Sequence, residues 1–279
     1  MLSFLKRDPK KQLKKVLGGY ELPSFPAVAH DALGLIRRGD TSATEIGRTL
    51  SKDPALSLAV LKTVNSAAYA VPTKVESVAQ AAGLLGLASV ESLILSVAVT
   101  RAIPGGSTPG FDAPSFWLLA SWRAATARAL AKETKSPRAD QLYTCGLLQD
   151  MAIPVLAHSL GTKYTEVLER GRESGDVLAK LERDTFGWDH AECASWLCDD
   201  WSIPEFIAGC IASHHGARLE GVTVPAEISL VCELREPGDE AGIDALVECA
   251  ERDHAMDGGR VRELVTACAD SADELASAL

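Results

Sequence analysis

The residues best suited to chemistry are one carboxylate and two histidines that lie far apart along the chain. Asp150 follows Gln149 in the stretch GLLQDMA (146–152), at the end of an apolar segment. His190 and His214 lie further on, in segments with helical spacing. Imidazoles and a carboxylate that converge from different helices can hold one divalent metal ion and leave a position open for water. The first hypothesis is therefore a metal-assisted hydrolytic site.

Helical periodicity indicates which histidines face inward. In IPEFIAGCIASHH (203–215), His214 continues a stripe of apolar residues, whereas His215 lies about 100° further round the helix and is expected to face away from the core. His190 shares a face with the apolar residues at i+4 and i+7. His190 and His214 can therefore meet Asp150. The alternative is that each is a hydrogen-bonded core histidine and that Asp150 caps the next turn.

Composition restricts the class of protein and of partner. The chain has 279 residues, of which 47% are hydrophobic, enough for a substantial core in one large domain or two small ones. Its formal net charge is −10, so the molecule as a whole repels phosphate backbones and nucleic acid is a disfavoured partner. A helix-turn-helix at 41–65 is further disfavoured because its second segment offers only Lys62 for contact with DNA.

Cysteines and apolar segments indicate the compartment. The seven cysteines include no C-x-x-C pair, which is typical of reduced core thiols and not of a disulfide framework or a zinc ribbon. The first 16 residues carry six basic side chains but no apolar run of signal-peptide length. No later stretch reaches about 20 unbroken apolar residues. We therefore expect a cytoplasmic protein without a transmembrane segment.

The fold class follows from periodicity and from helix-start patterns. Helical spacing dominates the chain, and the alternation typical of strands is scarce, so the protein is expected to be all α. Four capping patterns, in which a Ser, Thr or Asp precedes a Glu by three residues, agree with this class. They pair Ser42 with Glu45, Thr73 with Glu76, Asp189 with Glu192 and Ser202 with Glu205.

Segments rich in proline and glycine divide the chain into parts. These breaks are LPSFP (22–26), IPGGSTPGFDAP (103–114) and EPGDEAG (236–242). The expected parts are a basic N-terminal helix (1–20), a main domain (21–216) with lobes of about 21–103 and 112–216, and an acidic helical C-terminal segment (217–279). The acidic residues are interpreted as solvated helix faces, with an end-to-end or intersubunit contact as the alternative.

Sequence motifs occur on both sides of the central break. They are LPSFPAVAHDAL (22–33), the signature DPAL…NSAAY (53–69), SFWLLASWRAATARALA (115–131), the loop GLLQDMA, FGWDHAECASWLCDDWSIP (186–204) and SHHG (213–216). Together, from Leu22 to Gly216, they resemble the HDOD family, the HD-related output domain of bacterial signalling proteins. The resemblance implies an all-helical fold in which an N-terminal helical lobe packs on a lobe related to HD phosphohydrolases.

The resemblance also implies that the metal-binding set of the HD hydrolases has been lost. An active HD hydrolase has a first histidine in the helix at 115–131, where this chain has Leu119 and Ala120. The paired His-Asp has become Gln149 and Asp150, and the neutral glutamine carbonyl is a weak ligand for a transition metal. No catalytic residue, metal or cofactor is therefore expected. The residual metal candidates are Asp150, His190, His214 and His215.

The upstream signature also has a structural interpretation. Asp53 and Pro54 have the residue types of a helix N-cap and first helical position. Asn65 and Ser66 fall at the end of that helix, where they are expected to bond exposed carbonyls and fix the next turn. Contact with a partner or ligand is the alternative. The family-signature positions are Asp53, Pro54, Asn65, Ser66, Gln149 and Asp150.

Two functions from different classes follow from these observations. The incomplete ligand set and the resemblance favour a non-catalytic regulatory output module of bacterial signal transduction. Such a module would bind signalling proteins, with a nucleotide second messenger as a further candidate ligand. The alternative is a divalent-metal-dependent phosphohydrolase of a nucleotide or cyclic dinucleotide, with Asp150, His190 and His214 as metal ligands.

Overall fold

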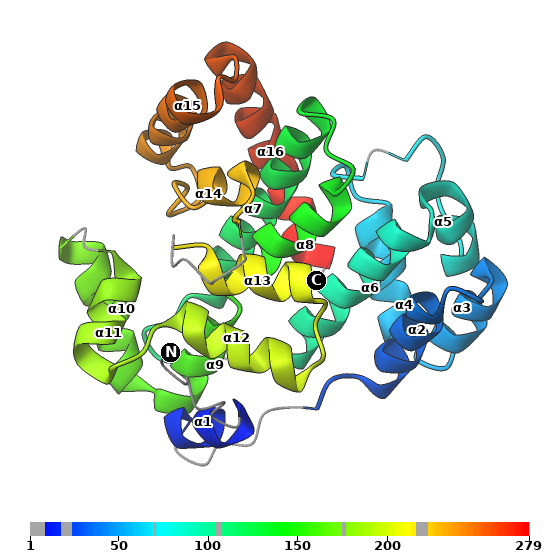
Figure 1. Cartoon of the computed structure of the whole chain (residues 1–279), viewed down its shortest axis with the longest axis horizontal. Coiled ribbons are helices and arrows are strands. Elements are labelled where there is room, and N and C mark those ends of the chain that lie inside the picture. The colour runs from blue at the N-terminus through cyan, green and yellow to red at the C-terminus, as the bar shows by residue number, and fades with distance from the viewer. Residues whose placement is uncertain are drawn as a thin grey trace, which may run out of the picture. The chain divides into compact units, whose positions relative to one another are not determined.

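The described secondary structure is helical (Figure 1). The computed structural model describes residues 9–17, 24–69, 71–103, 108–174, 177–215 and 223–278. Over these ranges the chain forms α-helices and no strand, apart from an isolated bridge between Thr108 and Phe111. The expectation of an all-α protein is confirmed.

The described helices fall into two compact units. The first unit takes in residues 1–23, 103–113 and 149–223 and contains α1 (Pro9–Val16), α9 (Ala152–Leu160), α10 (Thr162–Ser174), α11 (Leu178–Phe186), α12 (His190–Asp200) and α13 (Glu205–Ser213). The second takes in residues 24–102, 114–148 and 224–279 and contains α2 (Ala27–Arg38), α3 (Ala43–Leu50), α4 (Pro54–Val64), α5 (Val78–Leu85), α6 (Leu87–Ala102), α7 (Ala113–Glu133), α8 (Ala139–Leu148), α14 (Ala226–Val231), α15 (Glu240–His254) and α16 (Gly258–Ala278). Helix α1 is the described part of the basic helix expected at 1–20; residues 1–8 and 18–20 lie outside the described residues.

In the first unit, α12 contacts several other helices. Helices α1, α9, α11 and α13 all lie against it. Asp189 caps α12, because its carboxylate accepts a hydrogen bond from the Glu192 N–H at 2.8 Å, as the capping pattern predicts. His190 directly follows this cap and is buried. The start of α12 thus places an imidazole in the interior of this unit.

The C-terminal segment forms part of the core of the second unit. The ring of buried Trp122 on α7 packs among apolar side chains of α15 and α16, and its Nε1–H donates to the Val265 carbonyl at 2.9 Å. Leu246 and Val261 belong to the same cluster and are buried. The described part of the segment forms the three helices α14, α15 and α16, and in α15 and α16 the apolar stripes face inward while exposed acidic residues occupy the other faces.

The two units do not follow the lobes expected at about 21–103 and 112–216. Helices α7 and α8 belong to the same unit as α2–α6, whereas residues 103–113 belong to the other. The reason is the packing of α8 along α6, where the hydroxyls of Ser96 and Thr144 lie 3.0 Å apart in a buried position. A break rich in proline and glycine marks the end of a helix but does not indicate which unit the next helix joins.

Two of the four capping patterns were wrong. Ser42 caps α3 through the Glu45 N–H, as expected. Helix α5, however, is capped by Ser77, so Glu76 precedes the cap and Thr73 has no part in it. Ser202 adopts a positive φ of 53°, and α13 begins after Pro204, with Glu205 as its first residue. The required spacing was present in both cases, but a nearer serine or a proline set the helix start.

The signature residues of α4 have the structural roles expected for them. Asp53 caps α4 by accepting from the Leu56 N–H at 2.9 Å, and Pro54 is its first residue. At the other end, the Asn65 amide donates to the carbonyls of Leu61 and Val75 at 2.7 and 2.8 Å. The side-chain oxygen Oδ1 of Asn65 accepts a hydrogen bond from the Val75 N–H at 2.8 Å. Asn65 therefore joins the end of α4 to the chain ten residues later.

The substitution Asn65→Ala is expected to lower the free energy of unfolding by about 2 kcal/mol, because the backbone N–H and C=O of Val75 lose their partner together. Urea denaturation followed by circular dichroism measures this cost. Lys62→Ala, an exposed change on the same helix, is the control and should stay within about 0.5 kcal/mol of the unsubstituted protein. Equal stability of the two variants would contradict a structural role for Asn65.

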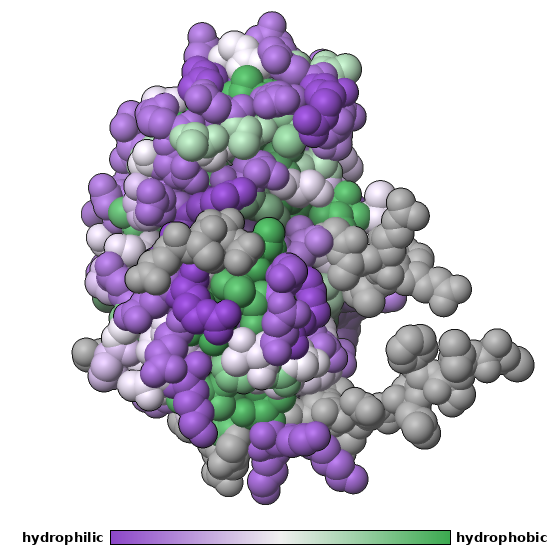
Figure 2. Space-filling model, turned by 90° about the vertical axis from the view of Figure 1, so that its left-hand side faces the viewer, coloured by the Kyte–Doolittle hydropathy of each residue, from purple (hydrophilic) through white to green (hydrophobic). Residues whose placement is uncertain are grey.

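The described residues expose few large hydrophobic side chains. On the face drawn in Figure 2, hydrophilic side chains cover most of the surface, with smaller hydrophobic areas among them. Among the described residues, the large hydrophobic side chains classed as exposed are Leu58, Leu84 and Val177. No helix in the described part of the chain combines the length and the apolar character needed to cross a membrane. All seven cysteines are free thiols.

Candidate metal centre

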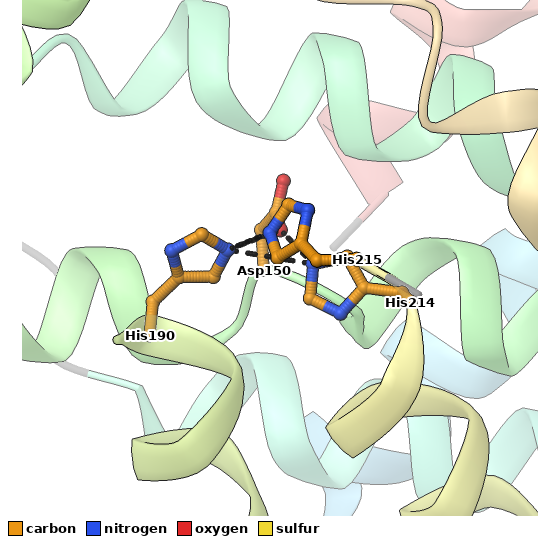
Figure 3. A group of neighbouring side chains, drawn as sticks. All are labelled: Asp150, His190, His214 and His215. Atoms are coloured by element: carbon orange, nitrogen blue, oxygen red, sulfur yellow. Dashed lines mark hydrogen bonds and ion pairs between the residues drawn. The ribbon is translucent and has the colours of Figure 1, made fainter. Parts of the chain in front are cut away.

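Three segments of the first unit bring Asp150 and three histidines together (Figure 3). Asp150 lies in the turn that joins α8 to α9. His190 is the first residue of α12, and His214 and His215 form the turn after the last residue of α13. Their four ligand atoms all lie within 4.8 Å of one another. We refer to this group as the four-ligand centre.

The geometry of the centre is defined by the Nε2 atoms of the three histidines and by one carboxylate oxygen of Asp150. Asp150 Oδ1 lies 3.1 Å from His214 Nε2 and 3.3 Å from His190 Nε2. The Nε2 atoms of His190 and His214 are 3.4 Å apart, and His215 Nε2 lies 2.7 Å from His190 Nε2. Figure 3 shows these atoms pointing toward one common position.

The opposite ring nitrogens of two histidines are held by acceptors. His214 Nδ1 lies 2.6 Å from the Ile211 carbonyl oxygen, and His190 Nδ1 lies 2.6 Å from Glu182 Oε2. A carbonyl accepts but does not donate, so His214 Nδ1 must carry the proton. The Glu182 carboxylate is likewise an acceptor, so His190 also carries a proton on Nδ1. In the neutral rings, both Nε2 lone pairs are therefore directed into the centre, as metal-ligating histidines require.

The donor set fits a divalent transition metal. Metal–nitrogen bonds of about 2.0–2.1 Å place adjacent ligand atoms of a tetrahedron about 3.3 Å apart. Three of the separations between ligand atoms, 3.1, 3.3 and 3.4 Å, match this edge. The separation of 2.7 Å between His190 and His215 is shorter, and His215, an exposed residue in a turn, is placed to move outward. Imidazole with one carboxylate suits zinc or iron better than magnesium or calcium.

Without a metal, a proton is expected to occupy the centre. Burial lowers the pKa of His190, but the Glu182 carboxylate and the hydrogen bonds to Asp150 and Glu182 outweigh it and raise the pKa to about 10. The protonated ring of His190 supplies positive charge next to the surrounding carboxylates and ring lone pairs. A metal ion would replace this proton, because both require the same Nε2 lone pair.

The structure places the residues considered from the sequence in different roles. Asp150, His190 and His214 meet, as the metal hypothesis required. His215 is exposed, as expected, yet its ring also reaches His190, because α13 ends at Ser213 and helical geometry no longer applies at 215. Gln149 is buried beside Asp150 but is not among the four converging residues. The other signature positions, Asp53, Pro54, Asn65 and Ser66, lie in the second unit, where Ser66 donates to the Thr63 carbonyl.

Glu182 was not singled out from the sequence. It lies on α11, eight residues before His190, and its side chain is fully buried. A glutamate followed directly by Arg183 and Asp184 in LERD looks like a solvated residue. Glu182 lies three residues after Ala179, which is also buried, so helical periodicity places the two on the same face of α11. The periodicity does not reveal the hydrogen-bond partner of Glu182.

Comparison with known proteins places these observations in a family. The sequence pattern of the HDOD domain matches residues 22–217. An uncharacterized protein from Treponema pallidum (strain Nichols) is 26% identical over 200 residues, a match that covers 70% of this chain and 38% of that protein. The present chain therefore aligns with well under half the length of this relative.

Solved structures share the fold. A candidate phosphohydrolase from Shewanella amazonensis SB2B superimposes with a TM-score of 0.74 at 20% identity, covering 96% of this chain and 97% of that chain. An HDOD domain protein of unknown function from Geobacter sulfurreducens gives a TM-score of 0.69 at 22% identity, covering 96% and 92%. A candidate signal transduction protein from Marinobacter aquaeolei VT8 gives 0.68 at 21% identity, covering 96% and 64%. By its sequence pattern over residues 22–217, and in agreement with this fold, the chain belongs to the HDOD family.

Proposed function

We propose that this chain is a signal-transduction module that binds one divalent transition-metal ion at the four-ligand centre. The observation that carries the proposal is the convergence of three imidazole Nε2 atoms and Asp150 Oδ1, with His190 and His214 held by acceptors at Nδ1. The incomplete HD ligand set led us to expect no metal. The four residues that remain nevertheless make a full set for a single ion such as zinc or ferrous iron.

The proposed role of the module is regulatory and non-catalytic. The HD hydrolase pattern has a first histidine where this chain has Leu119 and Ala120, and a second histidine where it has Gln149, so the ligand set of that pattern is incomplete. One ion at the centre would join the turn before α9 to α12 and α13, and so stabilise a surface for a partner. The proposed partners are other signalling proteins of the cytoplasm, since a regulatory module of this kind acts by binding.

A phosphohydrolase is the second candidate function, and one observation favours it. The centre is not fully enclosed, because the Asp150 side chain is 14% exposed and His215 is exposed. A bound divalent ion would supply a Lewis acid and lower the pKa of a coordinated water. Asp150 and the histidines would orient that ion, and the exposed side of the centre would admit a phosphorylated substrate.

Metal analysis tests the proposal directly. Protein purified without chelator or nickel resin is expected to contain about one zinc or iron ion per chain, since the four ligands belong to one centre. The Asp150→Ala variant is expected to lose most of this metal. Elemental analysis of both proteins gives the ratio, and a metal-free, folded protein that also fails to bind added zinc would overturn the proposal.

A turnover assay separates the two functions. Metal-loaded protein is incubated with nucleotides and cyclic dinucleotides, and release of phosphate or linear product is followed. The regulatory module is expected to show no turnover above that of the Asp150→Ala variant. Metal-dependent turnover that disappears in the variant would favour the phosphohydrolase.

A further inference from the structure

Glu182 connects the four-ligand centre to two neighbouring helices. Its Oε2 accepts from the His190 backbone N–H at 2.8 Å and lies 2.6 Å from His190 Nδ1. Its Oε1 accepts from the Tyr164 hydroxyl on α10. Both Glu182 and Tyr164 are fully buried. A chain of polar contacts thus runs from α10 through α11 to the first residue of α12.

The fully buried carboxyl group of Glu182 requires polar partners. Burial of an ionised carboxylate is costly unless it is hydrogen-bonded and paired with a cation. Within the described ranges, no lysine or arginine pairs with Glu182, and its ion-pair partner is the ring of His190. The ring of His190 is therefore the group that Glu182 orients.

The two buried histidines of the centre are held in different ways. His214 uses the backbone carbonyl of Ile211, which no substitution at position 211 removes. His190 uses a side chain, Glu182, which forms bonds to both its ring and its backbone. The orientation and tautomer of His190 therefore depend on one replaceable residue.

We infer that Glu182 is a positioning residue for metal binding, and that Tyr164 supports it. This inference rests on the proposed metal site. Glu182 keeps the proton of His190 on Nδ1, directs the Nε2 lone pair at Asp150 and His214, and makes the imidazole a stronger donor. Tyr164 supports the orientation of the carboxylate by donating its hydroxyl hydrogen to the second oxygen. Glu182 itself does not touch the metal.

The substitution Glu182→Gln tests this role with Co²⁺ as a spectroscopic probe. An amide either presents its NH₂ to His190 Nδ1, which favours the wrong tautomer, or presents a neutral carbonyl, which is a weaker acceptor. Co²⁺ affinity is expected to fall about 10–100-fold, with a shift in the visible absorption bands of bound Co²⁺. Glu169→Gln on α10 makes the same charge change at an exposed position and should alter neither property.

A second variant keeps the inference testable if Glu182→Gln does not fold. Tyr164→Phe retains the ring and removes only the hydroxyl that bonds Glu182. It is expected to fold, as judged by circular dichroism, and to bind Co²⁺ severalfold more weakly than the unsubstituted protein. Unchanged affinity and absorption in a folded Glu182→Gln protein, or in Tyr164→Phe where that protein does not fold, would overturn the inference alone. Failure of the unsubstituted protein to bind Co²⁺ would overturn it together with the proposed metal site.

Discussion

Replacement of His214 by alanine is expected to weaken Zn²⁺ binding about a hundredfold. Structural zinc sites with four protein ligands bind with about 10–16 kcal/mol, so one ligand accounts for about 3 kcal/mol, or two orders of magnitude in affinity. His214 is buried, and its Nε2 lies 3.1 Å from Asp150 Oδ1, so the substitution removes one of the four converging ligands. Competition of the apo protein with a chromophoric zinc chelator measures the change.

Thermal unfolding provides a second measure of the same prediction. Zinc at about 1,000 times its dissociation constant stabilises the native protein by about 4 kcal/mol. The unsubstituted protein should therefore melt at a clearly higher temperature with zinc than with a chelator, and His214→Ala should lose most of this difference. His254→Ala, an exposed histidine at the end of α15, is the control and should retain it. Equal zinc affinity in the two histidine variants would rule out the centre as the binding site.

The sequence predicted part of the centre because part of it obeys helical geometry. His190 and His214 lie on apolar stripes, which predict that both rings face inward, and both residues are buried. His215 lies beyond the end of α13, where the rotation per residue is set by a turn and not by the helix. Its approach to His190 at 2.7 Å could not be deduced from periodicity.

The outer contacts of the centre could not be predicted at all. The bond between Glu182 and His190 depends on how α11 packs against α12, and no local pattern encodes that packing. The absence of histidine at Leu119 and Gln149 led us to expect a site without metal. A count of lost ligands does not show whether the remaining ones converge.

The same distinction between local and tertiary signals holds for the fold. The N-caps Ser42, Asp53 and Asp189 depend on residues three positions apart, and each was predicted. The assignment of α7 to a unit depends on contacts with α15 and α16, more than 100 residues later. Those contacts depend on which apolar helix faces pack together. The acidic composition of the C-terminal segment does not predict them.

Replacement of Trp122 by alanine is expected to destabilise the second unit by about 4 kcal/mol, since a large buried aromatic side chain leaves a cavity when it is removed. Trp122 is 2% exposed and packs among Leu246, Val261 and Val265. Its Nε1–H also bonds the Val265 carbonyl, which the smaller residue would leave without this donor. Urea denaturation followed by far-ultraviolet circular dichroism measures the loss.

A matched variant on the same helix separates a core role from a general effect of removing tryptophan. Trp117 is only half-buried on α7, so Trp117→Ala should cost clearly less than Trp122→Ala. Limited proteolysis adds a positional readout, because loss of the Trp122 ring should expose α15 and α16 to cleavage before the rest of the unit. If both alanine variants were equally stable and α16 remained protected, the C-terminal segment would not depend on Trp122 for its packing. The expected outcome instead makes the acidic segment a structural part of the unit, packed on α7 around the ring of Trp122.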